Sequence, residues 1–324
     1  MVSPKTVSPK THFTEHRTTV DAPADAVYAL IADVTQWPWM FTPTVHAEQL
    51  ETDGDVERIR LWALANGEVR TWTSCREHDP EARRVSFRQE VSQAPVASMG
   101  GAWSVHPVSE YACEVVLTHD YAAVDDDPAG VDWIARACDR NSRAELADLK
   151  AAAEGEAVGG TVLTFTDALL TGADAKSLHD FVDRADLWTE RLPHVARVSL
   201  TEDPPRVQRL AMDTRAPDGS VHTTESIRIC LPDLRIVYKQ TRLPGLLAAH
   251  TGEWRFEAVG EEAVRLSSRH TAVIDPDAVA SVLGPDATVA DARAHVRRAL
   301  SGNSLATLRL ARAHAEESAG QRHD

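Results

Sequence analysis

The sequence predicts an α+β fold made of two tandem copies, each an antiparallel sheet of about seven strands curled around a long C-terminal helix. Three observations support this prediction: an internal repeat, short segments of alternating polarity bounded by turn residues, and a long amphipathic segment at the end of each copy. The chain has 324 residues, 43% of them hydrophobic and 26% charged, which leaves room for two globular domains.

The internal repeat consists of like residues that recur at a nearly constant separation. The separation drifts by only two residues over four segments, which indicates duplication rather than chance. The matched pairs are Pro43/Pro193, 150 apart; Gly67/Gly219, Ser74/Ser226, Arg76/Arg228 and Pro80/Pro232, 152 apart; and Gln89/Gln240, Gly101/Gly252, Trp103/Trp254 and His119/His270, 151 apart.

Copy one starts with an extended segment, His12–Val20, then a short helix and a Trp/Pro-rich turn at Trp37–Pro43. The helix shows a 3.6-residue apolar period at Val27, Leu30, Ile31 and Val34. Alternating segments separated by turn signals then predict antiparallel strands. Their expected ranges are Val45–Glu51, Val56–Ala65, Gly67–His78, Arg83–Glu90, Gly101–Pro107 and Cys113–Ala122. An amphipathic helix, Val131–Glu154, closes the copy with Ile134, Cys138, Leu146 and Leu149 on its apolar stripe.

Copy two repeats this order: an extended start at Val162–Leu170, a short helix and a turn at Trp188–Pro193. The helix is marked by Leu178, Phe181 and Val182. The strands are expected at Val195–Glu202, Arg206–Arg215, Gly219–Leu231, Arg235–Thr241, His250–Val259 and Ala263–Ile274. The closing helix, Thr288–Glu317, carries Val296, Leu300 and Leu308 on its apolar side.

The boundary between the copies is expected in the Ala/Glu/Gly-rich stretch Ala151–Gly160, which gives domains at residues 12–154 and 161–317. An insertion at Asp275–Asp286 widens the separation of Asn141 and Asn303 to 162 residues. A sheet curled around one helix has a concave apolar face that the helix does not fill. The arrangement therefore predicts an internal cavity in each copy.

Composition excludes several classes of protein. A net charge of −15 disfavours nucleic acid as a partner, and the lack of a signal peptide or an 18-residue apolar run favours a cytoplasmic protein without a membrane span. The scattered cysteines form no disulfide framework and no zinc motif, so we expect reduced packing residues. They are Cys75, Cys113, Cys138 and Cys230.

A motif in copy one carries a family resemblance. Residues 66–76 read N-G-E-V-R-T-W-T-S-C-R, after Trp37-Pro38 and before Ala94-Pro95 and the segment Met99–Trp103. This resembles the START/Bet v 1-like polyketide aromatase/cyclases, helix-grip proteins in which the pattern N-G-x-V-x-x-W-x-S-x-R lines a pocket. Copy two keeps Asp218-Gly219-Ser220-Val221, Ser226-Ile227-Arg228 and Gly252-Glu253-Trp254, but has Thr224 where copy one has Trp72.

Two such copies in one chain resemble the didomain aromatase/cyclases of bacterial type II polyketide synthases. The resemblance implies aldol cyclisation of the first ring in the C7–C12 pattern, dehydrative aromatisation, or both, on a poly-β-ketone. The alternative is a non-catalytic carrier of a lipid or another hydrophobic ligand with the same fold. A further alternative makes one copy catalytic and the other mainly structural, and the match at Trp72 then favours copy one.

Strand alternation places Arg70, Trp72, Ser74 and Arg76 on one face, which we expect to be the cavity face. With the resemblance, this makes Arg76, and Arg228 at the matched position, candidates for holding keto oxygens and stabilising enolate charge. The alternative for Arg76 is an ion pair with a carboxylate at the rim of the sheet.

His119 and His270 occupy matched places in the last strands and are candidate proton shuttles, with a structural role as the alternative. Ser74 and Ser226 are expected to donate hydrogen bonds to a carbonyl, not to act as nucleophiles, because no G-x-S-x-G elbow surrounds them. Candidate walls for the substrate, with plain core packing as the alternative, are Trp37, Trp72, Trp103 and Trp254.

We expect no cofactor and no metal, since the sequence has no metal triad, P-loop or dinucleotide fingerprint. Positioning of a reactive chain supplies much of the catalysis of an intramolecular aldol closure. The expected protein partner is the acidic acyl carrier protein of a type II polyketide synthase. Its predicted docking site is a stripe at the start of the first long helix, formed by Arg136, Arg140 and Arg143, with an ordinary solvated helix face as the alternative.

Overall fold

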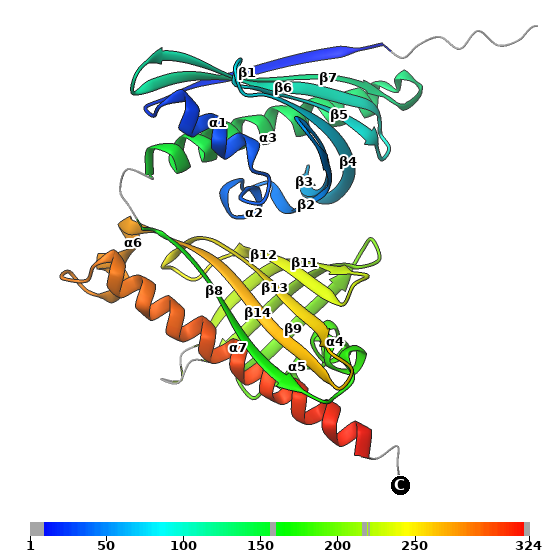
Figure 1. Ribbon diagram of the computed structural model, residues 1–324, viewed down its shortest axis with the longest axis vertical. Coiled ribbons are helices and arrows are strands. Elements are labelled where there is room, and N and C mark those ends of the chain that lie inside the picture. The colour runs from blue at the N-terminus through cyan, green and yellow to red at the C-terminus, as the bar shows by residue number, and fades with distance from the viewer. Residues whose placement is uncertain (1–9, 156–159, 216–218, 220, 321–324) are drawn as a thin grey trace, which may run out of the picture. The chain divides into compact units, whose positions relative to one another are not determined.

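The computed structural model describes residues 10–155, 160–215, 219 and 221–320. The chain divides after residue 159 into two compact units, called unit 1 and unit 2 here. Each unit contains one seven-stranded antiparallel sheet, a pair of short helices and a long C-terminal helix, which confirms the predicted α+β fold (Figure 1). None of the helices in these ranges combines the length and apolar character needed to cross a membrane.

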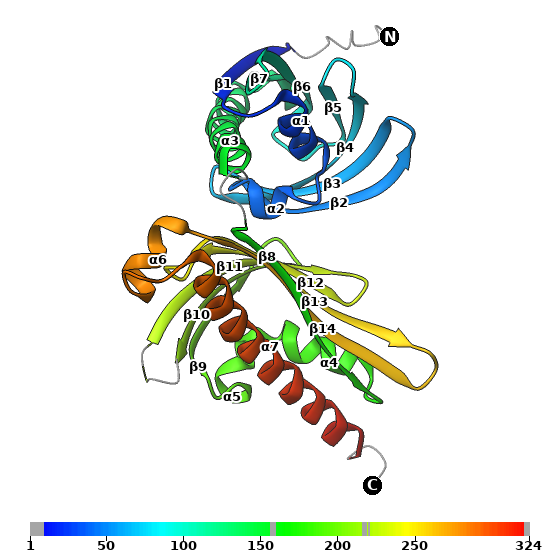
Figure 2. The same ribbon diagram turned by 60° about the vertical axis from the view of Figure 1, so that its left-hand side comes forward.

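In unit 1 the strand order is β1-β7-β6-β5-β4-β3-β2, so every neighbouring pair except β1 and β7 is consecutive in sequence. The sheet bends into an arc around α1 and α3 (Figure 2). The elements are β1 (His12–Val20), α1 (Ala24–Ala32), α2 (Trp37–Met40), β2 (Thr44–Asp53), β3 (Val56–Ala65), β4 (Glu68–Asp79), β5 (Arg84–Val91), β6 (Val96–Ser109), β7 (Ala112–Ala123), a 3₁₀ turn η1 (Val124–Asp126) and α3 (Pro128–Gly155).

Unit 2 has the matching strand order β8-β14-β13-β12-β11-β10-β9. Its one added helix, α6, falls in the predicted insertion, where Asp275 caps the helix and Pro276 occupies its first turn. The elements are β8 (Val162–Thr171), α4 (Ala175–Asp183), η3 (Ala185–Leu187), α5 (Trp188–Arg191), β9 (Val195–Glu202), β10 (Val207–Arg215), β11 (Val221–Leu231), β12 (Arg235–Arg242), β13 (Leu247–Val259), β14 (Ala263–Ile274), α6 (Pro276–Leu283) and α7 (Val289–Gly320).

Turn chemistry sets the register of the hairpin that carries the motif. Asn66 and Gly67 both have positive φ, 52° and 84°, as a two-residue type I′ turn requires. The turn aligns Leu61 with Trp72 and Glu57 with Arg76 across β3 and β4. In copy two, Asp218 at the place of Asn66 lies outside the described residues, as does Ser220 after the turn, whereas Gly219 at the place of Gly67 has the same positive φ, 84°.

The long helices pack their predicted apolar stripes against the sheets. In α3, Ile134, Cys138, Leu146 and Leu149 are all buried, as the periodicity predicts. In α7 the buried positions include Val296 and Leu308, whereas Leu300 is only partly buried at the edge of a second core cluster. Each helix therefore closes the concave side of its sheet along one stripe.

Several predicted boundaries differ from the structure, and two of the differences have a local cause. The Trp/Pro-rich turns form short helices, α2 and α5. In α2, Pro38 fits the first turn of the helix, where its missing N–H is not needed. Strand β6 starts at Val96 instead of Gly101, since β7 pairs with this irregular segment through a bulge between Val96 and Ser98. The four cysteines are free, as expected.

Matched glycines leave room for an aromatic ring against each sheet. A Cβ on Gly101 would stand 1.9 Å from the carbonyl oxygen of Thr118 and 2.8 Å from the ring of Phe87. A Cβ on Gly252 would stand 2.3 Å from the hydroxyl of Tyr238. These glycines bring Phe87 and Tyr238 close to the histidines of the last strands, where the two cavities lie.

Candidate active site

Unit 1 encloses a cavity of about 120 Å³ between its sheet and α3. Strands β2 to β7, with Trp37 of α2 and the loop before β6, supply one side, and α3 supplies the other. The walls therefore come from segments far apart in sequence. The lining residues are Trp37, Thr44, Leu61, Ala63, Ala65, Arg70, Thr71, Trp72, Gln89, Gln93, Ala94, Val96, Met99, His119, Trp133, Ile134, Ala137, Cys138, Asn141, Ser142 and Glu145.

His119 lines this cavity from β7. Its ring lies edge-on to Phe87 with the centroids 5.5 Å apart, and its Nδ1 has no hydrogen-bond partner among the described residues. Burial, together with the nearby His16, lowers the pKa of His119 to about 4. The imidazole is therefore neutral near pH 7 and able to accept a proton.

Glu145 faces the same cavity from α3. Burial raises the pKa of Glu145 to about 8, and the negative charge of Asp148 adds to this effect. The carboxyl group is therefore mostly protonated near pH 7. Ser142, one turn earlier, is fully buried and its hydroxyl has no partner among the described residues. The cavity thus combines a neutral base with a neutral carboxylic acid.

Arg76 does not reach the cavity, contrary to the expectation that it lies beside the substrate. It shares the face of Trp72, but four residues along a strand span about 13 Å. Its Nη1 donates to Glu57 Oε1 at 2.6 Å, and its Nη2 donates to the carbonyl of Ile31 at 2.7 Å. The guanidinium also stacks 4.9 Å from the ring of Trp37. The structure shows the alternative predicted for Arg76, an ion pair with a carboxylate, but this pair lies deep in the core and not at the rim of the sheet.

The remaining predicted residues of copy one divide between wall and core. Trp37 and Trp72 line the cavity. Trp103 is 3% exposed and stacks on Phe41 at 5.9 Å, so it is core packing and not a cavity wall. Ser74 is 3% exposed and lies outside the lining. A direct contact of Ser74 or Trp103 with a ligand in this cavity is therefore not supported.

Unit 2 encloses a second cavity of about 120 Å³. Of the predicted residues, Ser226, Arg228, Trp254 and His270 all line it, along with Thr224. Because Thr224 is smaller than Trp72, the cavity extends farther along its strand, to Ser226 and Arg228. The other lining residues are Trp188, Leu192, His194, Leu210, Met212, Thr214, Tyr238, Gln240, His250, Leu300, Asn303, Ser304 and Thr307.

His270 is the centre of a buried hydrogen-bond network that has no counterpart at His119. Its Nδ1 lies 3.0 Å from His250 Nε2 and 3.1 Å from the hydroxyl of Tyr238. Its Nε2 lies 2.6 Å from the hydroxyl of Ser304 and 3.1 Å from that of Ser268. Burial lowers the pKa of His270 to about 4 and that of His250 to about 3. Both imidazoles are therefore neutral near pH 7.

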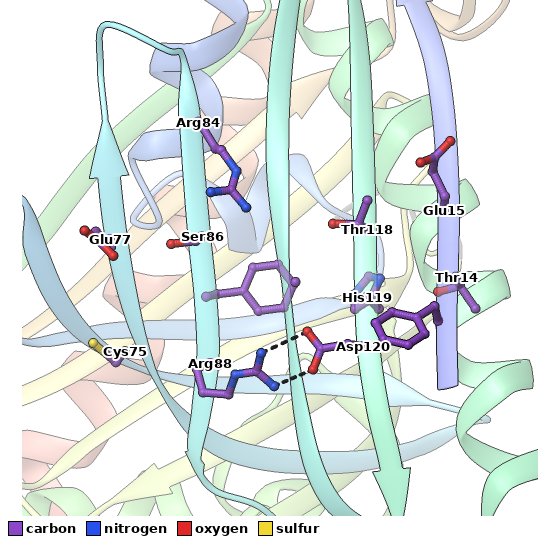
Figure 3. Close-up of a pocket in the computed structure, with 13 residues that line it drawn as sticks. Thr14, Glu15, Cys75, Glu77, Arg84, Ser86, Arg88, Thr118, His119 and Asp120 are labelled. Carbon is purple, nitrogen blue, oxygen red and sulfur yellow. Dashed lines mark hydrogen bonds and ion pairs between the residues drawn. The ribbon is translucent and has the colours of Figure 1, made fainter. Parts of the chain in front are cut away.

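A larger hollow of about 620 Å³ lies on the outer face of the unit 1 sheet (Figure 3). Arg88 and Asp120 form an ion pair on its wall, with Arg88 Nη2 donating to Asp120 Oδ1 at 2.9 Å. Gly101 has no side chain, and its cross-strand partner His119 borders both this outer hollow and the inner cavity. In the outer hollow Arg88 and Asp120 satisfy each other. The inner cavity keeps buried polar atoms without a partner among the described residues, namely His119 Nδ1, Ser142 Oγ and Arg70 Nε, so it is the better candidate site.

Sequence reasoning missed the helix residues of both cavities. Asn141 and Asn303 mark matched positions, and the neighbouring Ser142 and Ser304 follow the same separation. This signal identifies a shared face of the two helices, although nothing in it distinguishes Glu145 from the other acidic residues of α3. Tyr238 and His250 had no counterpart of the same type in copy one, so the repeat did not highlight them.

The fold and the two cavities define a class: tandem helix-grip proteins that enclose one mixed polar and apolar cavity in each copy. A family model described as "Polyketide cyclase / dehydrase and lipid transport" matches residues 11–154. The crystal structure of the di-domain ARO/CYC BexL from the BE-7585A biosynthetic pathway is 54% identical, with a TM-score of 0.84 over 94% of this chain and 99% of that one.

Curated relatives match along nearly the whole chain. The granaticin polyketide synthase bifunctional cyclase/dehydratase of Streptomyces violaceoruber is 48% identical, covering 96% of this chain and 95% of that protein. The actinorhodin polyketide synthase bifunctional cyclase/dehydratase of Streptomyces coelicolor is 47% identical, covering 94% and 97%. The chain belongs to the family of polyketide synthase bifunctional cyclase/dehydratases, and it is an enzyme.

Proposed function

We propose that this enzyme closes the first ring of a poly-β-ketone in the C7–C12 pattern and dehydrates the product towards an aromatic ring, with the chemistry in the cavity of unit 1. The observation that carries the proposal is that His119 and Glu145 both line the same cavity. The family membership supports the reaction type, and the aromatic walls Trp37, Trp72 and Trp133 suit a flat nascent ring.

In the aldol step, neutral His119 takes a proton from the carbon between two carbonyls, and the resulting enolate carbon attacks a ketone carbon of the same chain. Glu145 gives its proton to the ketone oxygen, which becomes a hydroxyl. A proton then returns from His119 to Glu145. In the dehydration step His119 removes a second carbon-bound proton, and the hydroxyl leaves as water with the proton of Glu145.

Arg76 acts in this proposal as a positioning residue. Its guanidinium joins the C-terminal end of α1 to Glu57 and supports the ring of Trp37, which forms part of the cavity wall. Arg70 lines the cavity itself and stacks on Trp133 at 5.1 Å. Its Nη2 pairs with Glu68 and its Nη1 donates to the carbonyl of Ala94, whereas its buried Nε has no partner among the described residues. Arg70 is therefore the better candidate in copy one for contacting keto oxygens.

We also propose that an acyl carrier protein delivers the substrate to unit 1 at the start of α3. Arg136, Arg140 and Arg143 are exposed there, while Trp133 and Ala137 of the same turns face the cavity. Arg143 is partly neutralised by Asp139, with its Nε 2.9 Å from the carboxylate. An acidic carrier fits such a stripe through weak, salt-dependent contacts.

The test is reconstitution with a minimal polyketide synthase and identification of the products. The whole enzyme should convert the mixture of spontaneous products to one with a C7–C12 first ring. His119→Gln, Glu145→Gln and Arg70→Gln should each return the mixture towards the spontaneous products at equal folded protein. An unchanged product pattern for all three variants would place the chemistry outside this cavity.

A further inference from the structure

Ser304 and His270 form a buried pair in the unit 2 cavity that has no role in ring closure by unit 1. The hydroxyl oxygen of Ser304 on α7 lies 2.6 Å from Nε2 of His270 on β14. Both side chains are 3% exposed, and both line the cavity. A serine nucleophile and the histidine that activates it lie roughly 2.6–3.2 Å apart, so the pair has the geometry of a nucleophile with its base.

The second nitrogen of the His270 ring has partners that orient it. Nδ1 lies 3.0 Å from Nε2 of His250 and 3.1 Å from the hydroxyl of Tyr238. We assign the ring hydrogen to Nδ1, which donates it to one of these groups and leaves Nε2 free to accept the hydroxyl hydrogen of Ser304. Burial lowers the pKa of His270 to about 4, so the imidazole is neutral near pH 7. Nucleophile, base and orienting group therefore follow one another in Ser304, His270 and His250.

Two serine hydroxyls approach Nε2 of His270, and they differ in access to the cavity. Ser268 lies 3.1 Å from this nitrogen, is fully buried and does not belong to the cavity lining. Ser304 lies closer and lines the cavity. The residue before it, Asn303, is exposed and also lines the cavity, so the cavity approaches the surface beside Ser304. Ser304 is therefore the hydroxyl that a carbonyl group in the cavity can contact.

The matched serine of unit 1 has no such arrangement. Ser142 is buried at the corresponding place on α3, and its hydroxyl has no partner among the described residues. His119 Nδ1 is likewise without a partner in this part of the chain. Unit 1 also has Met99 at the position of His250, so it lacks the orienting imidazole. The pairing of a serine with an oriented histidine is thus a feature of unit 2, which indicates a task different from that of unit 1.

We propose that unit 2 is an acyl-transfer site at which Ser304 cleaves an acyl thioester and releases the acyl chain as a carboxylic acid. The choice of a thioester rests on the proposed function, in which a carrier protein delivers the substrate. A thiol ionises more easily than an alcohol and leaves more readily, which suits a base as weak as a buried neutral imidazole. The activity itself goes beyond ring closure.

The reaction has two balanced steps. In the first, the Ser304 oxygen attacks the thioester carbon, and its proton passes to Nε2 of His270. The carbon–sulfur bond breaks, the sulfur takes that proton and leaves as a thiol, and an ester remains on Ser304. In the second, water attacks the ester carbon and gives a proton to His270. The ester carbon–oxygen bond then breaks, Ser304 recovers its proton from His270, and the carboxylic acid leaves.

The probe is the N-acetylcysteamine thioester of acetoacetic acid, a short β-keto acyl thioester. The full-length protein is mixed with the probe, and mass spectrometry measures the released N-acetylcysteamine and the mass of the acid-quenched protein. The unaltered protein should release the thiol faster than buffer does. It should also gain the mass of one acetoacetyl group, which peptide mapping assigns to Ser304.

The decisive variants change the nucleophile and its base. Ser304→Ala should abolish the mass gain, and His270→Gln should slow thiol release about 100-fold or more. Ser304→Cys should still form an adduct, now a thioester that neutral hydroxylamine removes, whereas the serine ester resists this reagent. The matched control Ser268→Ala takes the other hydroxyl away from the same histidine and should keep the adduct on Ser304. Thermal unfolding reports whether each variant is folded.

The outcomes separate this inference from the proposed function. Thiol release lost in both Ser304→Ala and His270→Gln supports the assignment, even where hydrolysis is too fast for the adduct to accumulate. Release that survives Ser304→Ala, an adduct on cysteine alone, or neither release nor adduct with the unaltered protein overturns it. Each of these results leaves the product test of His119 and Glu145 intact, because that test reads the ring pattern and not thioester cleavage.

Discussion

At the scale of single residues, opposite pKa shifts make His119 and Glu145 complementary. The same burial that keeps His119 neutral, with a pKa of about 4, keeps Glu145 protonated, with a pKa of about 8. Between about pH 4 and pH 8, His119 is therefore neutral and able to accept a proton, and Glu145 is protonated and able to donate one. A solvent-exposed pair would have the opposite charges at pH 7, as an ionised carboxylate and a partly protonated imidazole.

We predict that activity falls as the pH rises through about 8, because Glu145 then loses the proton it donates. Glu145→Gln should lower the rate about 100-fold or more and remove this alkaline limb. Asp148→Asn should instead move the limb to lower pH, since the charge of Asp148 helps to raise the pKa of Glu145. The measurement is the pH profile of product formation. An alkaline limb unaltered in both variants would assign it to another group.

Arg76 and Glu57 form a buried pair whose loss should appear in stability. We predict that Arg76→Met destabilises the protein by about 3–5 kcal/mol, because Glu57 loses its arginine and stays buried with only His78 and Gln49 as side-chain partners. The double variant Glu57→Gln, Arg76→Met should recover part of this loss. Arg228→Met, matched in position but without a carboxylate partner, should cost less.

Urea unfolding followed by circular dichroism checks this prediction. Equal losses for Arg76→Met and Arg228→Met would contradict it, since the two positions would then not differ in their counter-charge. Product analysis of the folded fraction tests the positioning role separately.

At the scale of elements, α3 performs two tasks on two faces. One face buries Ile134, Cys138 and Leu146 against the sheet and presents Glu145 to the cavity. The opposite face carries the exposed arginine stripe. Because the helix has 3.6 residues per turn, the two sets alternate along the same turns without competing for space.

We predict that the triple variant Arg136→Glu, Arg140→Glu, Arg143→Glu weakens binding of the acyl carrier protein about 10-fold or more at low salt, through loss and reversal of charge. The loss should shrink as ionic strength rises, since screening already weakens the contact in the unaltered protein. The matched control is Arg298→Glu, Arg309→Glu on α7, which changes exposed charge on the other long helix. Surface plasmon resonance against the carrier at two salt concentrations measures both effects. Binding indifferent to the α3 changes and to salt would move the docking site elsewhere.

At the scale of the whole molecule, two copies of one fold have acquired different interiors. Unit 1 keeps an arginine and a glutamic acid, Arg70 and Glu145, in its cavity. Unit 2 has Thr307 on its helix, and Arg228 and three histidines, His194, His250 and His270, line its cavity. The shared backbone conserves the position of the cavity, while side-chain exchange decides its charge.

Buried histidines should make the whole protein sensitive to acid. A histidine whose folded pKa lies below its unfolded value of 6.5 takes up its proton more readily in the unfolded chain. Its stabilising contribution is therefore complete above pH 6.5 and is lost as the pH falls towards about 4. We predict a loss of roughly 1–2 kcal/mol per buried histidine by pH 5.

The test substitutes His250 with methionine, the residue that copy one carries at the matched position 99. His250→Met should flatten the decline of unfolding free energy between pH 6.5 and 5, whereas His222→Gln, at an exposed position, should leave it unchanged. Urea midpoints measured across this range provide the comparison. A decline as steep in His250→Met as in the unaltered protein would rule out a contribution from this histidine.

The sequence by itself determined the duplication, the order of elements and the apolar stripes, because these depend on local periodicity and on turn residues such as Asn66-Gly67. It also identified His119, His270 and the matched arginines through the repeat. Strand alternation placed Arg76 correctly on the inner face of the sheet. Alternation does not show how far along the strand the cavity extends, so the prediction that Arg76 lines the cavity was wrong.

Only the tertiary structure decided which inward residues meet the cavity and in which protonation state. The pairing of β3 with β4 puts Glu57 beside Arg76, and the packing of α3 brings Glu145 to face the same space as His119. Such contacts join residues far apart in sequence, and the desolvation that shifts a pKa depends on every neighbour at once. The chemistry of the two cavities therefore follows from packing that no local pattern in the chain encodes.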